Sequence, residues 1–330
     1  MNLGTRIQSF TRLGELLGQS ASQDLTNLTI TNPWFTPREI RRALQSWATL
    51  LAPGNLVKWL TPYTLPDNLP TRNILVISSG NIPLVGFHDF LSVLISGNRY
   101  TGSLSSRDNQ LLPAIADLLI GINPDWENRI KLTGKPVPFD AVIATGSTNT
   151  SRYFQRAYRS VPSIIRKNRT SVAILTGSES RPEYDGLSAD ILTYYGLGCR
   201  SISHVFMPAG LSPGPLIEAL RTFGDWEPNP LLSDNLRYQN ALMTMMKVPF
   251  TDTGKVILTE NPSVHSPIGV VHYSYYPNDQ DVRNLVSMMP DELQCVVGKE
   301  YVPFGFAQQP ALWDYPDQID TIEFLQSLNR

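Results

Sequence analysis

The chain has 330 residues, of which 42% are hydrophobic and 17% charged. This composition excludes intrinsic disorder, a coiled coil and a collagen-like repeat. A length of this size predicts two lobes, because domains usually run to ~100–200 residues. The 27 basic and 29 acidic residues give a formal net charge of −2, which leaves no surplus positive charge to neutralise a nucleic acid. We therefore expect a globular protein whose partner is a small molecule.

The sequence also predicts the cellular compartment and its redox environment. Its two cysteines, Cys199 and Cys295, are too few for a disulfide framework and too far apart for a CxxC-type zinc site, which favours a reducing environment. Polar residues interrupt residues 1–18, so they lack the apolar core of a secretory signal. No segment approaches the ~18–20 apolar residues of a membrane span. We expect a cytoplasmic protein with no membrane span.

The first predicted elements are helical. Thr36, Pro37 and Glu39 place a cap hydroxyl, a proline at the first helical position and a glutamate at the third, which predicts a helix over 37–51. Four prolines then mark residues 52–72 as a connector that sustains neither a helix nor a central strand.

From residue 73 strand patterns alternate with helix patterns. We expect strands at 74–78, 98–106, 141–146 and 171–177, and helices at 84–97, 111–122 and 149–158. The second half predicts helices near 189–195 and 279–287, and strands near 204–207, 255–259, 269–273 and 293–297. This alternation is typical of right-handed crossovers, and it predicts a doubly wound parallel sheet followed by a second α/β lobe.

The expected domains follow from this pattern. Residues 1–177 form the N-terminal helices and a nucleotide-binding domain, 178–305 form a second domain with Cys199, and 306–330 are a tail that packs back on the fold. The polar, proline-containing segment 178–185 is the expected hinge.

Ligands of such sheets bind at the carboxyl ends of the strands, so the loops after Ser78, Ala144 and Gly177 are the first to consider. None carries a GxGxxG or a GxxxxGK[ST] pattern. In the first loop, Asn81 precedes a helix that Pro83 can start, so its amide can donate to a developing oxyanion or simply cap the helix. The turn 145–148 can hold a phosphate or be an ordinary capped turn.

The remaining reactive side chains allow similar alternatives. Cys199 lies among glycines and beside Arg200, a setting that favours a nucleophilic thiolate, although free cysteines are usually buried hydrophobes. Cys295 lies in a strand-like apolar run and is expected in the core. The four histidines show no metal-ligand spacing and are interpreted as structural. The basic cluster at 166–169 is expected to be a solvated loop, with contact to a nucleotide phosphate as the alternative.

Four short motifs in order resemble the aldehyde dehydrogenase superfamily, most closely the acyl-CoA reductases related to the fatty-acid reductase of bacterial luminescence. Residues 80–84 (GNIPL) resemble its Asn-x-Pro oxyanion segment, 145–148 (TGST) its Gly-Ser-Thr cofactor turn, 196–199 (GLGC) its nucleophilic cysteine segment, and 302–305 (VPFG) its Pro-Phe-Gly segment. The match covers about 73–324. It implies an aldehyde-dehydrogenase-like fold in which Cys199 and Asn81 are catalytic. It also implies a cofactor held by Ser79, Ser103, Gly146, Ser147, Thr148 and Phe304.

Two departures from the family pattern are informative. Ile174 takes the place of the glutamate that activates water against the thioester, which favours reduction over hydrolysis. Ser103 takes the place of a lysine that contacts the adenosine ribose, so cofactor affinity and choice stay open. The glutamate expected ahead of a Gly-Pro segment is also missing near 263–267, and no nicotinamide-ribose contact is carried over.

The resemblance predicts an oxidoreductase that converts an acyl-CoA or acyl-carrier thioester to an aldehyde through a thioacyl-cysteine intermediate. The expected cofactor is NADPH, with NADH as the alternative. The rival interpretations are a non-catalytic binding or scaffold subunit of an acyl-processing complex, and a cysteine acyltransferase without redox chemistry. The protein is expected to act either as a homo-oligomer or within such a complex, without nucleic acid and without a metal.

Overall fold

The computed structural model describes residues 1–19, 21–28, 30–67, 70–132 and 137–329. It divides into two compact units, which are described separately. Unit 1 comprises Met1–Asn168 and Ala311–Arg330, and unit 2 comprises Arg169–Pro310.

Unit 1 opens with four helices: α1 (Leu3–Gly18), α2 (Ala21–Thr26), α3 (Pro37–Leu50) and α4 (Pro53–Leu60). The capping of α3 is as predicted, because the Thr36 hydroxyl accepts from the Glu39 amide at 3.4 Å. The prediction of a connector without helix over 52–72 is wrong in its first part, since α4 occupies 53–60. Pro53 lies in the first turn of α4, where its missing N–H has no intrahelical partner to lose.

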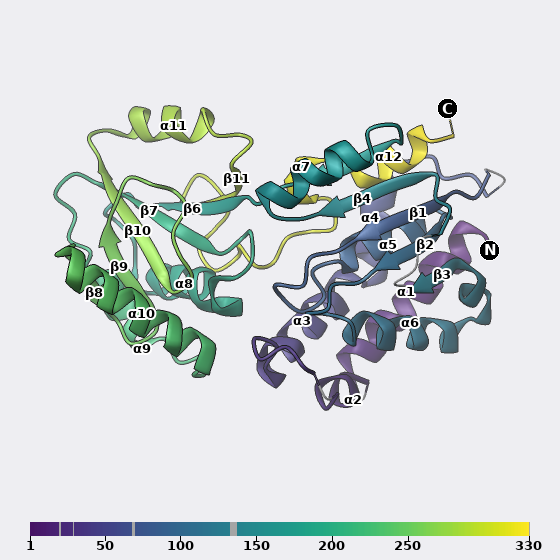
Figure 1. The fold of residues 1–330 in the computed structure, drawn as a ribbon, viewed down its shortest axis with the longest axis horizontal. Coiled ribbons are helices and arrows are strands. Elements are labelled where there is room, and N and C mark those ends of the chain that lie inside the picture. Colours follow the sequence, from purple (N-terminus) through teal and green to yellow (C-terminus); the bar gives the residue numbers. More distant parts are fainter. Residues whose placement is uncertain (20, 29, 68–69, 133–136, 330) are drawn as a thin grey trace. The chain divides into compact units, whose positions relative to one another are not determined.

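A five-stranded parallel sheet forms the centre of unit 1, in the order β3-β2-β1-β4-β5. The strands are β1 (Asn73–Ile77), β2 (Arg99–Ser103), β3 (Ile130–Leu132), β4 (Ala141–Thr145) and β5 (Ser163–Arg166). The helices that follow in chain order are α5 (Phe87–Ile95), α6 (Leu111–Ile122), the 3-10 helix η1 (Pro124–Arg129), α7 (Thr148–Ala157) and, from the C-terminal segment, η3 (Pro316–Gln318) and α12 (Thr321–Ser327). The strand order reverses direction between β1 and β4, with α7 on one side of the sheet and α6 on the other (Figure 1).

Two predictions within unit 1 need correction. Pro83 does not start a helix, because α5 begins only at Phe87 and turns fill the preceding residues. Leu84 adopts a left-handed φ of 60° within these turns, which no helix accommodates. The basic cluster at 166–169 is not wholly a solvated loop: Arg166 ends β5 and is 2% exposed.

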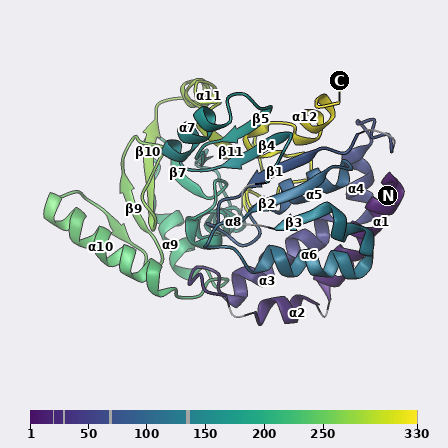
Figure 2. The same ribbon diagram turned by 45° about the vertical axis from the view of Figure 1, so that its right-hand side comes forward.

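Unit 2 contains a six-stranded sheet in the order β11-β6-β7-β10-β9-β8, parallel except for the β8–β9 pair. Its strands are β6 (Thr170–Ile174), β7 (Ile202–Pro208), β8 (Thr251–Asp252), β9 (Ile257–Glu260), β10 (Val270–Tyr276) and β11 (Leu293–Val297). Its helices are α8 (Arg181–Leu192), the 3-10 helix η2 (Thr193–Gly196), α9 (Gly214–Thr222), α10 (Pro230–Met246) and α11 (Asp279–Ser287). Helix α11 covers one face, and α8 and α9 cover the other (Figure 2).

The start of unit 2 lies earlier in the chain than the domain start we expected. Strand β6 pairs with β7 and β11, so residues 170–174 belong to the second sheet and not to the sheet of unit 1. The expected hinge at 178–185 contains the first turn of α8, where the Glu183 carboxylate accepts from the Ser180 amide at 2.6 Å. Proline and serine therefore start a helix here instead of interrupting the lobe.

Candidate functional site

The first group of predicted site residues gathers at one edge of the sheet of unit 1. Ser103 ends β2 and is the register partner of Ile77, which ends β1, while Thr145 ends the adjacent strand β4. The loops that follow these strands hold Ser79, Asn81 and Gly146. This edge is the carboxyl edge of the sheet at its topological switch point, where ligands of doubly wound sheets bind.

The loop after β1 fixes the orientation of the Asn81 amide. The Ser79 hydroxyl donates to Asn81 Oδ1 at 2.9 Å, so Oδ1 is the acceptor end and Nδ2 the donor end of that amide. Further along the loop, the Leu84 amide donates to the Asp108 carboxylate at 3.3 Å. Burial raises the pKa of Asp108 to about 6. The expectation that Asn81 caps a helix is not met, because the N-cap position of α5 belongs to Gly86.

The turn after β4 leads directly into α7. Ser147 is the N-cap residue, and its hydroxyl accepts from the Thr150 amide at 3.3 Å. A Cβ at Gly146 would lie 2.9 Å from the Thr150 side chain, so a larger residue here would require that side chain to shift. Ser147 and Thr148 are exposed at a helix N-terminus, where the helix dipole favours anions. Both interpretations of this turn, the capped turn and the phosphate site, are compatible with this geometry.

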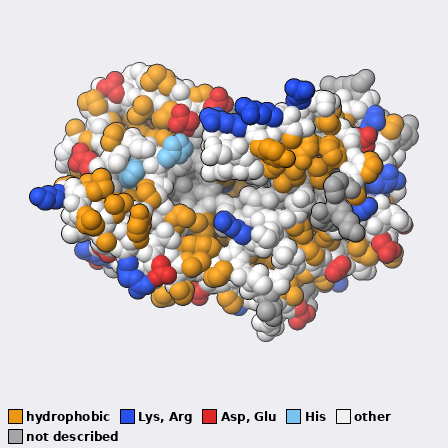
Figure 3. All heavy atoms as spheres, in the orientation of Figure 1, with side chains coloured by type: hydrophobic (Ala, Val, Ile, Leu, Met, Phe, Trp, Pro, Cys, Tyr) orange, Lys and Arg blue, Asp and Glu red, His pale blue; other side chains and the backbone are white. Residues whose placement is uncertain are grey.

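Positive charge accompanies this helix. Arg152 and Arg156 are exposed in α7, and Arg159 is exposed directly after it. Lys and Arg side chains gather over α7 on the face shown in Figure 3. An anionic ligand near this helix would therefore meet a favourable potential.

The second group of predicted site residues belongs to unit 2. Cys199 is exposed and lies just before β7, at the amino end of that strand. This exposure excludes the buried-hydrophobe alternative for Cys199. Cys295 is 6% exposed in β11 and packs in the core, as expected.

The chain reaches Cys199 by a strained path that the sequence did not reveal. Tyr194 and Tyr195 have φ angles of 53° and 56°, and Gly196 follows with 74°. Left-handed conformations cost of order 1–3 kcal/mol for residues other than glycine, so the surrounding structure must hold them. Both tyrosines are buried, which supplies that support. In the sequence, only Gly196 indicates that the backbone is left-handed at this point.

Hydrogen bonds pin the segment that carries Cys199. The Ser171 hydroxyl donates to the Cys199 carbonyl at 2.9 Å, and Arg200 Nε donates to the Ala307 carbonyl at 2.6 Å. Gln308 Nε2 donates to the Ser201 hydroxyl at 3.1 Å. The Cys199 loop is thus joined to the segment that follows Phe304.

Asp190 in α8 holds that same segment, and no sequence motif indicates this role. Its carboxylate accepts from the Gly305 amide at 2.7 Å and from the Ala307 amide at 2.9 Å. Burial raises the pKa of Asp190 to about 7, against the opposing effect of these two hydrogen bonds. Phe304 is half-buried, and its side chain packs against the core of unit 2.

The loop after β6 is the third loop in which the sequence predicts a ligand. Two of its backbone N–H groups already donate to a side chain of the same loop. The Glu179 carboxylate accepts from the Thr176 amide at 2.7 Å and from the Gly177 amide at 2.9 Å. Ile174, which ends β6 where the family pattern has a glutamate, is 6% exposed and packs in an apolar cluster. This loop therefore offers neither a carboxylate at that position nor open backbone donors at residues 176 and 177.

The histidines of both units make hydrogen bonds to the protein. His88 bonds the Leu312 carbonyl at 2.9 Å, and burial lowers its pKa. His204 bonds the Ser263 carbonyl at 3.0 Å and the Ser274 hydroxyl at 2.9 Å, and burial lowers its pKa to about 4.

Across the described residues, no group of three or more His, Cys, Asp or Glu side chains is placed to hold a metal ion. Nor does any described helix combine the length and apolar character of a membrane span.

Comparison with known proteins identifies the fold. No family model and no curated protein sequence matches the chain. A solved structure described as a candidate aldehyde dehydrogenase from Burkholderia cenocepacia is 14% identical with a TM-score of 0.69, over 88% of this chain and 73% of that one. An NAD-dependent benzaldehyde dehydrogenase from Corynebacterium glutamicum is 13% identical with a TM-score of 0.68, over 90% and 76%. An aldehyde dehydrogenase from Bacillus cereus, solved with NAD+, is 15% identical with a TM-score of 0.62, over 86% and 69%.

The chain therefore has the aldehyde dehydrogenase-like α/β fold, with one parallel sheet and a second, mixed sheet. The predicted fold class is confirmed. At these identities the similarity extends to the fold, and the chemistry is argued from the residues below.

Proposed function

We propose that this protein is a nicotinamide-dependent reductase of acyl thioesters, with Cys199 as the nucleophile. The observation that carries the proposal is the exposed thiol of Cys199 on a strained, hydrogen-bonded loop. Strained backbone concentrates at functional sites, and an exposed cysteine held in this way is suited to nucleophilic attack. Similar solved structures include dehydrogenases described as NAD-dependent or solved with NAD+, which supports a nicotinamide cofactor.

The residues at the carboxyl edge of the unit 1 sheet suit such a cofactor. The N-terminus of α7, capped by Ser147, would hold a phosphate, and Ser79 and Ser103 would contact the remainder of the nucleotide. The segment after β2 offers Arg107, which is exposed, whereas the nearby Asp108 is engaged with the Leu84 amide. A basic residue after the second strand accommodates a 2′-phosphate, which favours NADPH over NADH. When bound, the reduced nicotinamide supplies the hydride.

In the proposed reaction, the thiolate of Cys199 attacks the thioester carbonyl, forming a C–S bond and an oxyanion. The Asn81 amide and the Cys199 backbone N–H would donate to that oxyanion, and Ser79 orients the amide for this role. The C–S bond to the leaving thiol then breaks, and the thiol takes a proton. After hydride addition to the acyl carbon, the thiohemiacetal on Cys199 collapses to the aldehyde and restores the thiolate. Ile174 leaves no carboxylate at its position to activate water, which favours reduction over hydrolysis.

The test is to mix the protein with an acyl-CoA, first without and then with NADPH. We expect mass spectrometry to find the acyl group on Cys199, and we expect nicotinamide absorbance to fall when NADPH is added. Cys199→Ala should abolish both signals, with a rate loss of at least about 10³-fold, whereas the buried control Cys295→Ala should retain them. Asn81→Ala should lose about 10²–10³-fold in kcat.

The other outcomes identify the rival functions. An acyl group on Cys199 with unchanged nicotinamide absorbance would indicate a cysteine acyltransferase. The absence of an acyl adduct, together with no NADPH or NADH binding in calorimetry, would indicate a scaffold subunit. Undiminished acyl-CoA reduction by Cys199→Ala would contradict the assigned nucleophile.

A further inference from the structure

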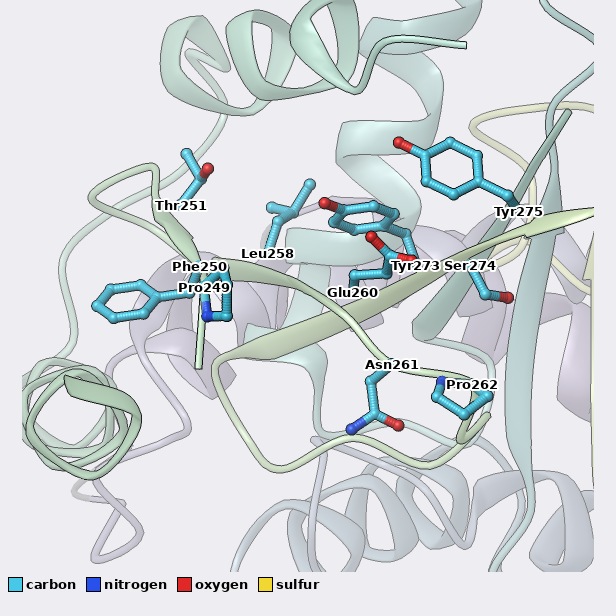
Figure 4. A pocket seen from close by; sticks show the side chains of 10 residues that line it. All are labelled: Pro249, Phe250, Thr251, Leu258, Glu260, Asn261, Pro262, Tyr273, Ser274 and Tyr275. Atoms are coloured by element: carbon cyan, nitrogen blue, oxygen red, sulfur yellow. The ribbon is translucent and has the colours of Figure 1, made fainter. Parts of the chain in front are cut away.

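A cavity of about 550 Å³ opens in unit 2 beside the carboxyl ends of β9 and β10. Its lining is Pro249, Phe250, Thr251, Leu258, Glu260, Asn261, Pro262, Tyr273, Ser274 and Tyr275. Figure 4 shows Pro249 and Phe250 on one side of this space and Tyr275 on the other. The cavity therefore combines aromatic walls with a single acidic side chain.

The acidic side chain is next to one of the rings. Glu260 and Tyr273 are register partners in the parallel β9–β10 pair, so their side chains share a face of the sheet. Figure 4 shows the Glu260 carboxylate beside the Tyr273 ring. Glu260 is exposed, and none of the described residues that line the cavity is a Lys or Arg. The lining therefore supplies no positive charge to neutralise this carboxylate.

The two tyrosines present their rings as adjoining walls. Tyr273 and Tyr275 lie two residues apart on β10, with ring centroids 5.8 Å apart and planes at 81°. Tyr275 is 39% exposed, so its ring is accessible from solvent. Ring faces carry partial negative charge, and perpendicular rings beside a carboxylate attract an organic cation more than a neutral ligand.

One basic side chain of this region, Lys255, is engaged elsewhere. Lys255, which precedes β9, donates to the carbonyls of Leu220, Arg221 and Phe223 at 3.2, 2.8 and 2.6 Å. It therefore caps the end of α9.

This cavity is separate from Cys199. Tyr273 and Tyr275 are register partners of Val205 and Met207 in β7, whereas Cys199 precedes the first residue of that strand. At ~3.3 Å per residue, the step from Ile202 to Val205 alone advances about 10 Å along β7 toward its carboxyl end. The two sites therefore lie toward opposite ends of the sheet.

We propose that the cavity lined by Glu260, Tyr273 and Tyr275 binds a small organic cation of the alkylammonium class. The cation would lie against the tyrosine rings with its charge facing Glu260. This site is independent of the proposed reductase function, because it uses none of the residues assigned to that reaction.

The experiment uses choline chloride as the probe and 3,3-dimethylbutan-1-ol as its neutral isostere, which has a carbon in place of the charged nitrogen. Both are titrated into the full-length protein by NMR and calorimetry. We expect choline to bind at least about tenfold more tightly than the isostere, and this preference to weaken with salt. Equal affinities, or no choline binding, would overturn the proposal.

Variants locate the binding. Tyr275→Ala should weaken choline binding by about 5- to 30-fold, whereas Tyr275→Phe should retain it because the ring face remains. Glu260→Gln should reduce the preference for choline over the isostere. Tyr238→Ala, which removes a 63%-exposed tyrosine from α10 in the same unit, is the matched control and should bind like wild type. Unchanged choline binding in both Tyr275→Ala and Glu260→Gln would place the ligand elsewhere and overturn the proposal.

Discussion

At the scale of single residues, a buried ion pair joins three segments of unit 1. Arg166 Nη1 lies 2.6 Å from Asp89 Oδ2, with side chains 3% and 8% exposed. Arg166 Nη2 also donates to the Thr321 hydroxyl at 3.0 Å. Strand β5, helix α5 and helix α12 therefore depend on one guanidinium, which is costly to bury unless its carboxylate partner is present.

Removing that partner should be strongly destabilising. We expect Asp89→Ala to lower the free energy of unfolding by about 3–5 kcal/mol, because it leaves the Arg166 charge buried and unpaired. The matched control is Asp185→Ala, which breaks an exposed pair with Arg181 at 2.8 Å and should cost less than ~1 kcal/mol. Urea denaturation measures both. Similar small losses in the two variants would show that Arg166 is solvated when unpaired.

At the scale of elements, helix α8 positions the loop at residues 304–307 of unit 2, in part through a glycine that has no side chain to keep that loop away. Gly186 approaches the Phe304–Gly305 backbone so closely that a Cβ would lie 2.8 Å from the Phe304 carbonyl carbon. One turn further on, Asp190 accepts hydrogen bonds from the amides of Gly305 and Ala307. The segment that contacts the Cys199 loop is therefore seated on α8 by both close packing and hydrogen bonds.

Two helical glycines should consequently respond in opposite ways to the same substitution. Gly186→Ala should be destabilising, by about 1–3 kcal/mol, because the methyl group meets backbone atoms that cannot rotate away. Gly121→Ala in α6, where a Cβ meets no atom within 4 Å, should be stabilising by up to ~1 kcal/mol through helix propensity. Thermal unfolding compares the two, and a stabilised Gly186→Ala would refute the close approach.

At the scale of the whole chain, the C-terminal segment returns to unit 1 after the chain has passed through unit 2. Trp59 Nε1 donates to the Tyr315 hydroxyl at 2.7 Å, and His88 Nε2 donates to the Leu312 carbonyl at 2.9 Å. Ile322 and Leu325 of α12 are buried. Unit 1 is thus built from two separate parts of the sequence, whereas unit 2 is continuous.

Deleting residues 311–330 should destabilise unit 1 selectively. The deletion exposes the apolar surface beneath α12 and leaves Trp59 without its hydrogen-bond partner, so we expect the loss of several kcal/mol. Differential scanning calorimetry should show a lowered or missing transition for unit 1 and a retained transition for unit 2. Truncation after Ser327, which keeps α12, is the control and should have a small effect. An unchanged profile after the longer deletion would show that unit 1 folds without its C-terminal part.

The sequence by itself determined the elements whose signals are local. The apolar periodicity at 111–122 predicted α6 at the observed bounds. The helix expected near 279–287 and the strand expected near 293–297 are confirmed as α11 and β11. These patterns follow from which face of each element is buried, which adjacent residues report directly. The same patterns, with four short motifs in order, were sufficient for the fold class.

Only the tertiary structure decided the burial of Arg166, the strained path through Tyr194 and Tyr195, and the hydrogen bonds of Asp190. Each depends on partners far away in the sequence, such as Asp89 for Arg166 and Gly305 for Asp190. A charged or strained residue is tolerated only when distant groups compensate its free-energy cost, and no local pattern records where those groups will be.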